Sequence, residues 1–397
     1  MAFDPLAFFL QYKWVILFYS FVILLISINR KKFEIQAKII ALYRTSIGLK
    51  LMDRIAGRQR ELLRVIGYTG IGICYFAMIG IIFLILQSLW KLFTVPDAPP
   101  GIGLIIPGIH IPGSPVFVPL WYGLIALFCV VLVHEFSHGI IARVHKIPVK
   151  SSGIVFFGPL IGAFVEPDEE DLRKRDDITQ YSVFAAGPFS NILLAVIIAL
   201  ILNFAFFPLQ EAITEPVGFS FDEIQDGYPA QTAGLEAGMI IQKVNGEDMY
   251  QGEVFLERIA SIKPNETIIL ESKDESFEII TAEHPDNDSK GYIGIVGIRN
   301  ESQLKNQNWI MNAVLFILTW IMGLFKWIFV LSLGIGLANL LPLGPVDGGR
   351  MLQVTLQKIK GEEKGNRLWK KISILCLTVL LLNIFFPAIR YILGLFL

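Results

Sequence analysis

Residues His134, Glu135 and His138 form a short motif, His-Glu-Phe-Ser-His, whose side chains and spacing suit metal-dependent hydrolysis. On a helix, residues four positions apart share one face, so both imidazoles can bind a single Zn²⁺ ion. Glu135 would then lie beside the water that the metal activates, where a carboxylate can accept and return a proton. The motif therefore predicts a zinc hydrolase. The simplest alternative is that it only marks the place where a helix emerges among lipid headgroups.

A catalytic zinc ion takes three protein ligands and keeps one position open, so the motif needs a third ligand elsewhere in the chain. Val144 stands where some peptidases carry a third histidine, and His145 is one residue off that face. Asp347, at the end of the segment Asn339-Leu-Leu-Pro-Leu-Gly-Pro-Val-Asp347, is the stronger candidate. Glu166, in Val-Glu-Pro, is the alternative, because some soluble peptidases with this motif use a glutamate as their third ligand.

The composition places this motif in a membrane protein. Of the 397 residues, 54% are hydrophobic and 17% are charged, and the mean hydropathy is +0.58, whereas a soluble domain carries about 25% charged residues. Ionisable groups inside a membrane helix are costly, so three of them in five residues need a partner such as a metal ion. The net charge of −1 gives no indication of a nucleic-acid partner. Three cysteines without a Cys-x-x-Cys pair predict neither a disulfide framework nor a cysteine zinc site: Cys74, Cys129 and Cys376.

Six apolar segments predict transmembrane helices, since about 20 apolar residues cross a bilayer core of ~30 Å. They lie within residues 8–29, 65–90, 111–133, 178–210, 309–341 and 372–397. The segment 30–64 holds ten Lys or Arg residues and three acidic ones, which places it on the cytoplasmic side. We therefore expect a multi-pass protein of the cytoplasmic membrane, with both termini outside and the metal motif toward the cytoplasm.

The segment 309–341 is too long for one perpendicular crossing, so we expect it to tilt, to break near Gly323 or to have its first half along the interface. It is predicted to cross the membrane once. A single crossing from outside to inside brings Asp347 to the depth of His134, and two crossings would leave it on the opposite side. One crossing therefore agrees with Asp347 as the third ligand.

Residues 215–299 are polar and form a predicted insert outside the membrane. The stretch Pro229–Leu235 predicts a short helix, and the alternation over Ile240–Val244 followed by Asn245-Gly246 predicts a strand and a hairpin turn. This arrangement resembles a PDZ domain of the bacterial protease type, which implies capture of an extended substrate peptide at a sheet edge. A small β-rich cap without a ligand is the alternative.

The segment Gly153–Val165 predicts two short β runs around a Gly158-Pro159 turn, just after the metal motif. It is too short to cross as a helix, so we expect a re-entrant hairpin, with a cytoplasmic loop on the bilayer as the alternative. A transmembrane helix hides its peptide bonds in its own hydrogen bonds and must unwind before it is cut. An edge strand here could pair with unwound substrate, and Phe164 is the predicted substrate contact in the outer strand.

Together, three motifs resemble the site-2 protease family of intramembrane zinc metalloproteases. They are the His-Glu-x-x-His motif in a predicted span, Asn-x-x-Pro-x-x-x-x-Asp-Gly at Asn339–Gly348, and Ala-Ala-Gly-Pro-Phe-Ser-Asn at Ala185–Asn191. The resemblance covers about residues 120–350. Val346 stands where the family usually has leucine, which is a conservative apolar change.

The resemblance implies one zinc ion per chain and the chemistry of a peptidase. Asn191 could instead form a plain hydrogen bond between helices, and Asn339 either contacts substrate or does the same. The implied site residues are the zinc ligands His134, His138 and Asp347, the catalytic acid and base Glu135, Asn191 to hold the substrate or the developing oxyanion, and Asn339 as a weaker candidate for substrate binding.

We therefore expect a zinc endopeptidase that cuts transmembrane segments of other membrane proteins, as in regulated intramembrane proteolysis. Its expected partners are those substrates, the lipid bilayer and a peptide at the PDZ-like insert. Family behaviour implies tethered regulators or leftover signal peptides as substrates. The alternatives are a membrane zinc peptidase that uses Glu166 as a ligand and cuts soluble tails, and a catalytically silent PDZ adaptor.

The predicted fold is a mainly α membrane protein with six transmembrane helices, a re-entrant β-hairpin and an inserted α+β PDZ-like domain. Its predicted parts are a first span (1–30), a cytoplasmic interfacial helix (31–64), a first core part with the catalytic helix and hairpin (65–210), the PDZ-like domain (211–300), and a second core part with the third metal ligand and the last span (301–397).

Overall fold

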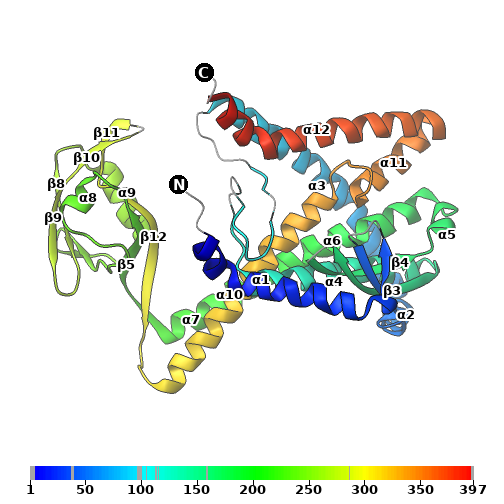
Figure 1. Ribbon diagram of the computed structural model, residues 1–397, viewed down its shortest axis with the longest axis horizontal. Helices are drawn as coiled ribbons and strands as arrows, with labels where there is room; N and C mark the ends of the chain where they lie inside the picture. Colours follow the sequence, from blue (N-terminus) through cyan, green and yellow to red (C-terminus); the bar gives the residue numbers. More distant parts are fainter. Residues whose placement is uncertain are drawn as a thin grey trace. The chain divides into compact units, whose positions relative to one another are not determined.

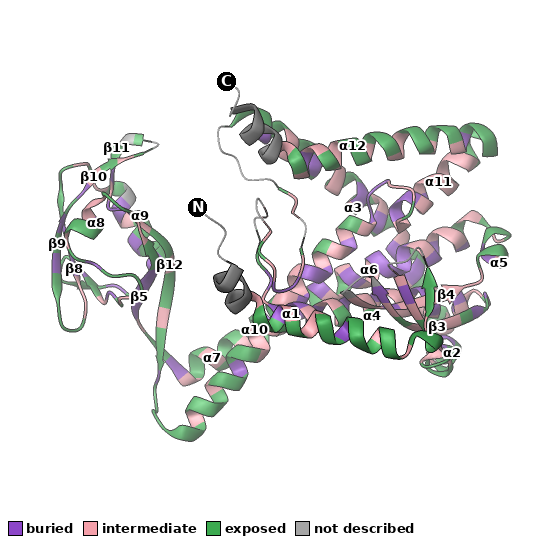
Figure 2. Cartoon of the chain, in the orientation of Figure 1, coloured by how far each residue is buried: buried purple, intermediate pink, exposed green. Residues whose placement is uncertain are grey.

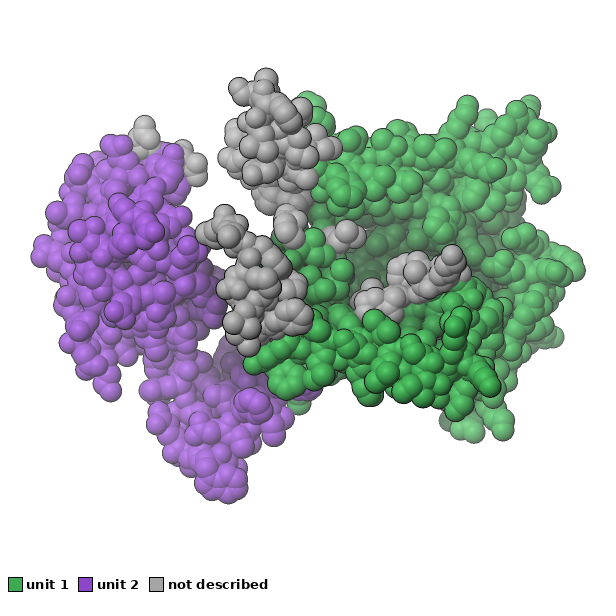
Figure 3. Space-filling view, viewed as in Figure 1, with its two compact units in different colours: residues 1–202, 321–397 green, residues 203–320 purple. Residues whose placement is uncertain are grey.

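The computed structural model describes residues 5–36, 40–95, 101–103, 105–111, 114, 116–157, 160–285 and 287–394. The chain forms two compact units (Figure 3), one of residues 1–202 and 321–397 and the other of residues 203–320. All residues of the predicted site belong to the first unit.

Long apolar helices make up most of the first unit (Figure 1). Five helices in the described part of the chain are long and apolar enough to cross a membrane: α3 (Arg60–Thr94), α4 (Leu120–Val144), the run Asp177–Ile213 that starts with α6 (Asp177–Ile201) and ends with α7 (Phe207–Ile213), α10 (Trp309–Asn339), and the part Glu362–Phe386 of α12 (Glu362–Gly394). Little of the apolar surface of these helices is buried inside the protein. Figure 2 shows most of α12 as exposed. The chain is thus a multi-pass membrane protein.

The first predicted span corresponds to helix α1 (Pro5–Ile28). The part of it with described side chains, Tyr12–Ile28, is apolar but shorter than the five long helices. A sixth crossing therefore stays a prediction.

The prediction of an interfacial helix over residues 31–64 is wrong for the first half of this segment. That half forms the end of a 3₁₀ helix (Arg30–Lys32) and strands β1 (Glu34–Gln36) and β2 (Ile40–Thr45), and the α-helix α2 (Leu49–Arg58) follows them before α3 begins. Strand β2 pairs antiparallel with β3 (Val149–Phe157), more than 100 residues away. This distant partner satisfies the backbone N–H and C=O groups of β2, and local helical spacing carries no sign of it.

Strands β1 and β2 extend a hairpin of β3 and β4 (Leu160–Pro167) into a four-stranded antiparallel sheet with β4 at its edge. The two predicted β runs thus form paired strands, and the Gly-Pro turn between them lies outside the described residues. Strand β4 packs along α4 (Figure 1). Entry of the hairpin into the membrane stays a prediction.

Helix α4 begins at Leu120 rather than at Ile111, with Pro119 as the residue before its first turn. Proline lacks a backbone N–H and is tolerated at this end of a helix. Helix α10 runs unbroken from Trp309 to Asn339, so the alternative of a break near Gly323 is wrong, and the single crossing stays a prediction. A short loop then leads to α11 (Asp347–Lys360).

The second unit is an α+β fold around a buried core that includes Phe219, Phe221 and Phe255. The Asn245-Gly246 turn is confirmed: both residues have positive φ, and the flanking strands pair across it. The PDZ assignment stays a prediction. The elements of this unit after α7 are β5 (Thr214–Ile224), α8 (Pro229–Thr232), β6 (Lys243–Val244), β7 (Glu247–Asp248), α9 (Gly252–Ser261), β8 (Thr267–Glu271), β9 (Ser276–Ile280), β10 (Ala282–His284), β11 (Asn287–Tyr292) and β12 (Ile295–Leu304).

Candidate metal centre

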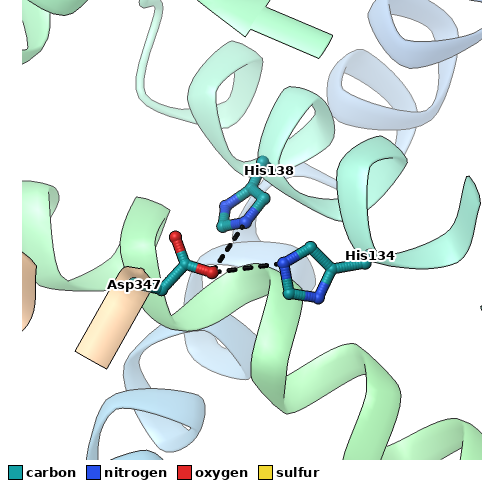
Figure 4. Close-up of side chains that lie close together, drawn as sticks. All are labelled: His134, His138 and Asp347. Carbon is teal, nitrogen blue, oxygen red and sulfur yellow. Dashed lines mark hydrogen bonds and ion pairs between the residues drawn. The ribbon is translucent and has the colours of Figure 1, made fainter. Parts of the chain in front are cut away.

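Two histidines of α4 and the first residue of α11 bring their ligand atoms together (Figure 4). Nε2 of His134 lies 3.1 Å from Oδ2 of Asp347, and Nε2 of His138 lies 3.4 Å from the same oxygen. One ligand atom of each residue lies within 4.8 Å of the other two. Both histidines are buried. Among the described residues, this is the one group of His, Cys, Asp or Glu side chains arranged closely enough to hold a metal ion.

The Nδ1 atoms, on the other side of each imidazole, both have partners on α6. Nδ1 of His138 lies 2.7 Å from the carbonyl oxygen of Val183. Nδ1 of His134 lies 3.1 Å from the side-chain amide of Asn191. Helix α6 thus orients both rings with Nε2 toward Asp347, which is how outer hydrogen bonds commonly hold metal-binding histidines.

Gly187 allows α6 to lie this close to the histidines. A Cβ atom at position 187 would lie 2.3 Å from Nε2 of His138 and 2.5 Å from Nε2 of His134. Any side chain here would therefore fill the space beside the two nitrogens. Glycine leaves that space to a metal ion.

The backbone around Asp347 is packed tightly enough to hold the carboxylate in place. A Cβ atom at Gly348 would lie 2.3 Å from the carbonyl oxygen of Leu340, and one at Gly349 would lie 1.6 Å from that of Leu343. The loop after α10 therefore folds directly onto the first turn of α11. This contact explains the Asp-Gly-Gly sequence.

A cavity of about 530 Å³ opens beside the three ligands. Glu135 lines it, and its carboxylate accepts a hydrogen bond from the backbone N–H of Val165 on β4 at 3.2 Å. Asn339 lines it as well, and its Nδ2 donates to the carbonyl oxygen of Ile335 at 3.1 Å. The second amide hydrogen and the amide oxygen of Asn339 remain available for other partners.

Glu166 also lines the cavity, but its carboxylate is bound elsewhere. It forms an ion pair with Arg44 of β2 and accepts a hydrogen bond from Oγ of Ser151 at 2.7 Å. The Arg44 guanidinium also lies 5.7 Å from the ring centre of Phe164. Phe164 is not one of the described residues that line the cavity. The geometry therefore favours neither Glu166 as a metal ligand nor Phe164 as a direct substrate contact.

The rim of the cavity carries paired charges. Lys150 lies 3.2 Å from Asp168, and Arg350 lies 3.1 Å from Glu169. The backbone N–H of Asp171, followed by the Lys150 ammonium, holds the pKa of Asp168 below its usual value. The mouth of the cavity is therefore lined by charged side chains.

Five of the residues predicted from the sequence line one cavity: His134, Glu135, His138, Asn339 and Asp347. Asn191 behaves differently, because it has no exposed surface and contacts His134 instead of the cavity. Gly187 and the carbonyl of Val183 also contribute to the site and were not predicted from the sequence. Gly187 belongs to the Ala-Ala-Gly-Pro segment, so the sequence did contain a motif that could have pointed to it. A backbone carbonyl is present in every residue, so no sequence motif points to the carbonyl of Val183.

The residues present fit a zinc ion. Two imidazoles and one carboxylate are a common donor set of catalytic zinc, which then keeps one position for water or substrate. The two Nε2 atoms and one carboxylate oxygen converge, and Gly187 adds no atom between them. This geometry favours a metal site over a helix end that only emerges among headgroups.

Comparison with known proteins agrees with this chemistry. The sequence profile of Peptidase family M50 matches residues 122–382. An uncharacterised protein of Methanocaldococcus jannaschii is 27% identical over 356 residues, which are 87% of this chain and 84% of that protein. The regulator of sigma-W protease RasP of Bacillus subtilis is 25% identical over 227 residues, 45% of this chain and 50% of RasP. A Thermotoga maritima protein provisionally named a zinc metalloprotease is 24% identical over 226 residues, 46% of this chain and 43% of that protein.

Proposed function

Because the chain belongs to peptidase family M50, the site-2 protease family, we propose that it is a zinc endopeptidase that cuts transmembrane segments of other membrane proteins. The family comprises zinc metalloproteases of regulated intramembrane proteolysis. The observation that carries the proposal is the convergence of both imidazoles on the Asp347 carboxylate, at 3.1 and 3.4 Å. It supports His134, His138 and Asp347 as the ligands of one zinc ion.

A zinc ion bound there would polarise the scissile carbonyl and lower the pKa of water toward ~7. Glu135 lines the same cavity and acts as general base, then as general acid toward the leaving amine. Asn339 offers its free amide hydrogen to the developing oxyanion or to the substrate backbone. This role, implied for Asn191 by the family resemblance, suits Asn339 better because Asn339 lines the cavity.

The substrate must be extended at the scissile bond, because a helix hides its carbonyls in its own hydrogen bonds. Strand β4 supports a place for such a segment. It is the edge of its sheet, and the N–H of Val165 on that edge already bonds to Glu135. We propose that substrate pairs with this edge next to the catalytic carboxylate.

The proposal also covers the orientation of the chain in the membrane and the role of the α+β unit. The basic segment 30–64 supports a catalytic cavity that opens toward the cytoplasm. The α+β unit would then lie outside, where it binds a substrate peptide or excludes intact ectodomains. Tethered regulators and leftover signal peptides are the substrate classes we propose.

The proposal is tested with the purified full chain in lipid nanodiscs. Zinc per chain is measured by mass spectrometry, and cleavage is measured with an embedded single-span substrate. Glu135→Gln should keep its zinc, and its turnover rate should fall about 10²–10⁴-fold, which is the usual contribution of general acid–base catalysis. A wild-type chain that takes up no zinc, or a Glu135→Gln chain that cuts as fast as wild type, would contradict the proposal. Cells that carry either form then reveal the natural substrates, by proteomics of truncated membrane proteins.

A further inference from the structure

We infer that Asn191 is a positioning residue that sets the tautomer of His134, by accepting a hydrogen bond from Nδ1–H through its side-chain oxygen. The inference rests on the proposed function in one respect, since it takes His134 as a zinc ligand.

Asn191 is buried and is held by contacts with helices α4 and α10. It has no exposed surface, and its amide lies 3.1 Å from Nδ1 of His134. Its backbone carbonyl accepts a hydrogen bond from Oγ of Ser332 on α10 at 2.8 Å. A Cβ atom at Gly336, also on α10, would lie 3.1 Å from Cβ of Asn191. The amide thus faces His134 from a fixed position between two helices.

The neighbouring histidine shows what a zinc ligand needs. Nδ1 of His138 faces the carbonyl of Val183, which can only accept, so this nitrogen must carry the proton. Nε2 of His138 then has a free lone pair. A neutral imidazole that donates Nδ1–H to an outer acceptor is the usual form of a metal-binding histidine.

His134 faces a side chain that can either donate or accept. If Nδ2 of Asn191 donated to Nδ1, the proton of the ring would lie on Nε2 and block the lone pair that faces Asp347. No other hydrogen bond among the described residues holds the amide that way, and amide oxygen and nitrogen occupy nearly equivalent positions. Zinc ligation by His134 therefore requires Oδ1 toward Nδ1–H.

This role differs from holding an oxyanion or substrate. An oxyanion donor would change turnover and leave the affinity for zinc unaltered. A tautomer-setting acceptor changes the affinity for zinc itself, typically by 10–100-fold when the outer partner is removed. The two roles therefore separate in a binding measurement without substrate.

The experiment uses the full chain in nanodiscs and compares Asn191→Leu, which lacks the acceptor, with Asn191→Asp, which keeps an acceptor and loses the donor. The matched control is Asn383→Leu. Asn383 is also a fully buried asparagine of a long apolar helix, but its Nδ2 lies 3.3 Å from the backbone carbonyl of Ile85 and not beside a histidine. The zinc dissociation constant is measured by competition with a chromogenic chelator. The thermal midpoint of the zinc-free protein is measured in parallel.

We expect Asn191→Leu to raise the zinc dissociation constant by about 10–100-fold. Asn191→Asp should stay within about tenfold of wild type, since a carboxylate is a common outer partner of metal-binding histidines. Asn383→Leu should change the midpoint of the zinc-free protein but not the affinity. Unchanged affinity in Asn191→Leu would overturn the inference, as would loss of affinity in a folded Asn191→Asp. If Asn191→Leu does not fold, the Asp variant alone decides. A wild-type chain without zinc affinity would instead remove the proposed function.

Discussion

Oδ2 of Asp347 lies 3.1 Å from Nε2 of His134, although the two residues are 213 positions apart in the chain. The contact joins the first turn of α11 to the C-terminal half of α4. Both residues belong to the same compact unit, so the site is complete without the α+β unit between them in sequence. The candidate metal centre therefore depends on how two distant segments pack.

Asp347→Asn tests the third ligand. An amide has no charge and is a weak zinc ligand, so the zinc dissociation constant should rise by more than about 100-fold, above the range for loss of an outer partner. Glu166→Gln is the matched control, because Glu166 lines the same cavity and pairs with Arg44. It should keep wild-type affinity. Zinc loss in Glu166→Gln with retention in Asp347→Asn would instead support the alternative ligand set.

Gly187→Ala tests the space beside the two imidazoles. The new methyl group would lie 2.3 Å from Nε2 of His138, so one of the rings must move and zinc affinity should fall at least about tenfold. Gly80→Ala on α3 is the control, since nothing lies within 4 Å of a Cβ there. That change should be neutral or stabilise the helix by up to about 1 kcal/mol. Wild-type zinc affinity in a folded Gly187→Ala would show that the site lies elsewhere.

Local spacing was enough to predict the histidine pair, because the i and i+4 positions of one helix share a face whatever surrounds them. Asp347 needed a second step, the argument that one crossing of 309–341 brings it to the depth of His134. Helix α10 is unbroken over this segment, which agrees with a single crossing. Most of the chemistry at the ligands was therefore accessible from residue types, spacing and membrane topology.

What the sequence could not predict depends on contacts between segments. The partner of Asn191 is a histidine 57 positions away, and a polar residue in a span does not indicate which of several helices it faces. The pairing of β2 with β3 overrode the helical spacing of residues 31–64 for the same reason. The carbonyl of Val183 is a backbone group, which every residue has, so it carries no signal at all.

Gly349→Ala tests how firmly the loop after α10 holds Asp347. A Cβ atom there would lie 1.6 Å from the carbonyl oxygen of Leu343, so the loop must shift at a cost of about 3 kcal/mol or more. Both the thermal midpoint of the zinc-free protein and the zinc affinity should fall. Gly344→Ala is the control in the same loop, with an ordinary contact of 3.4 Å to Trp369. Equal behaviour of the two variants would argue against a rigid loop.

Ala163→Pro tests whether the edge of β4 binds substrate. The N–H of Val165 points away from β3 to Glu135, so by strand alternation the N–H of Ala163 also points away from β3 and that of Phe164 points toward it. Proline at 163 therefore removes an edge donor while the ladder to β3 remains. If substrate accepts this hydrogen bond, kcat/KM should fall about tenfold, the equivalent of one hydrogen bond of about 1.4 kcal/mol, with zinc affinity unchanged.

Two variants serve as controls for Ala163→Pro. Ala163→Ser keeps the N–H and should cut normally. Phe164→Pro, which breaks the ladder to Gly153, should instead lower the thermal midpoint. Normal cleavage by Ala163→Pro would exclude strand pairing at this edge and leave the peptidase itself intact.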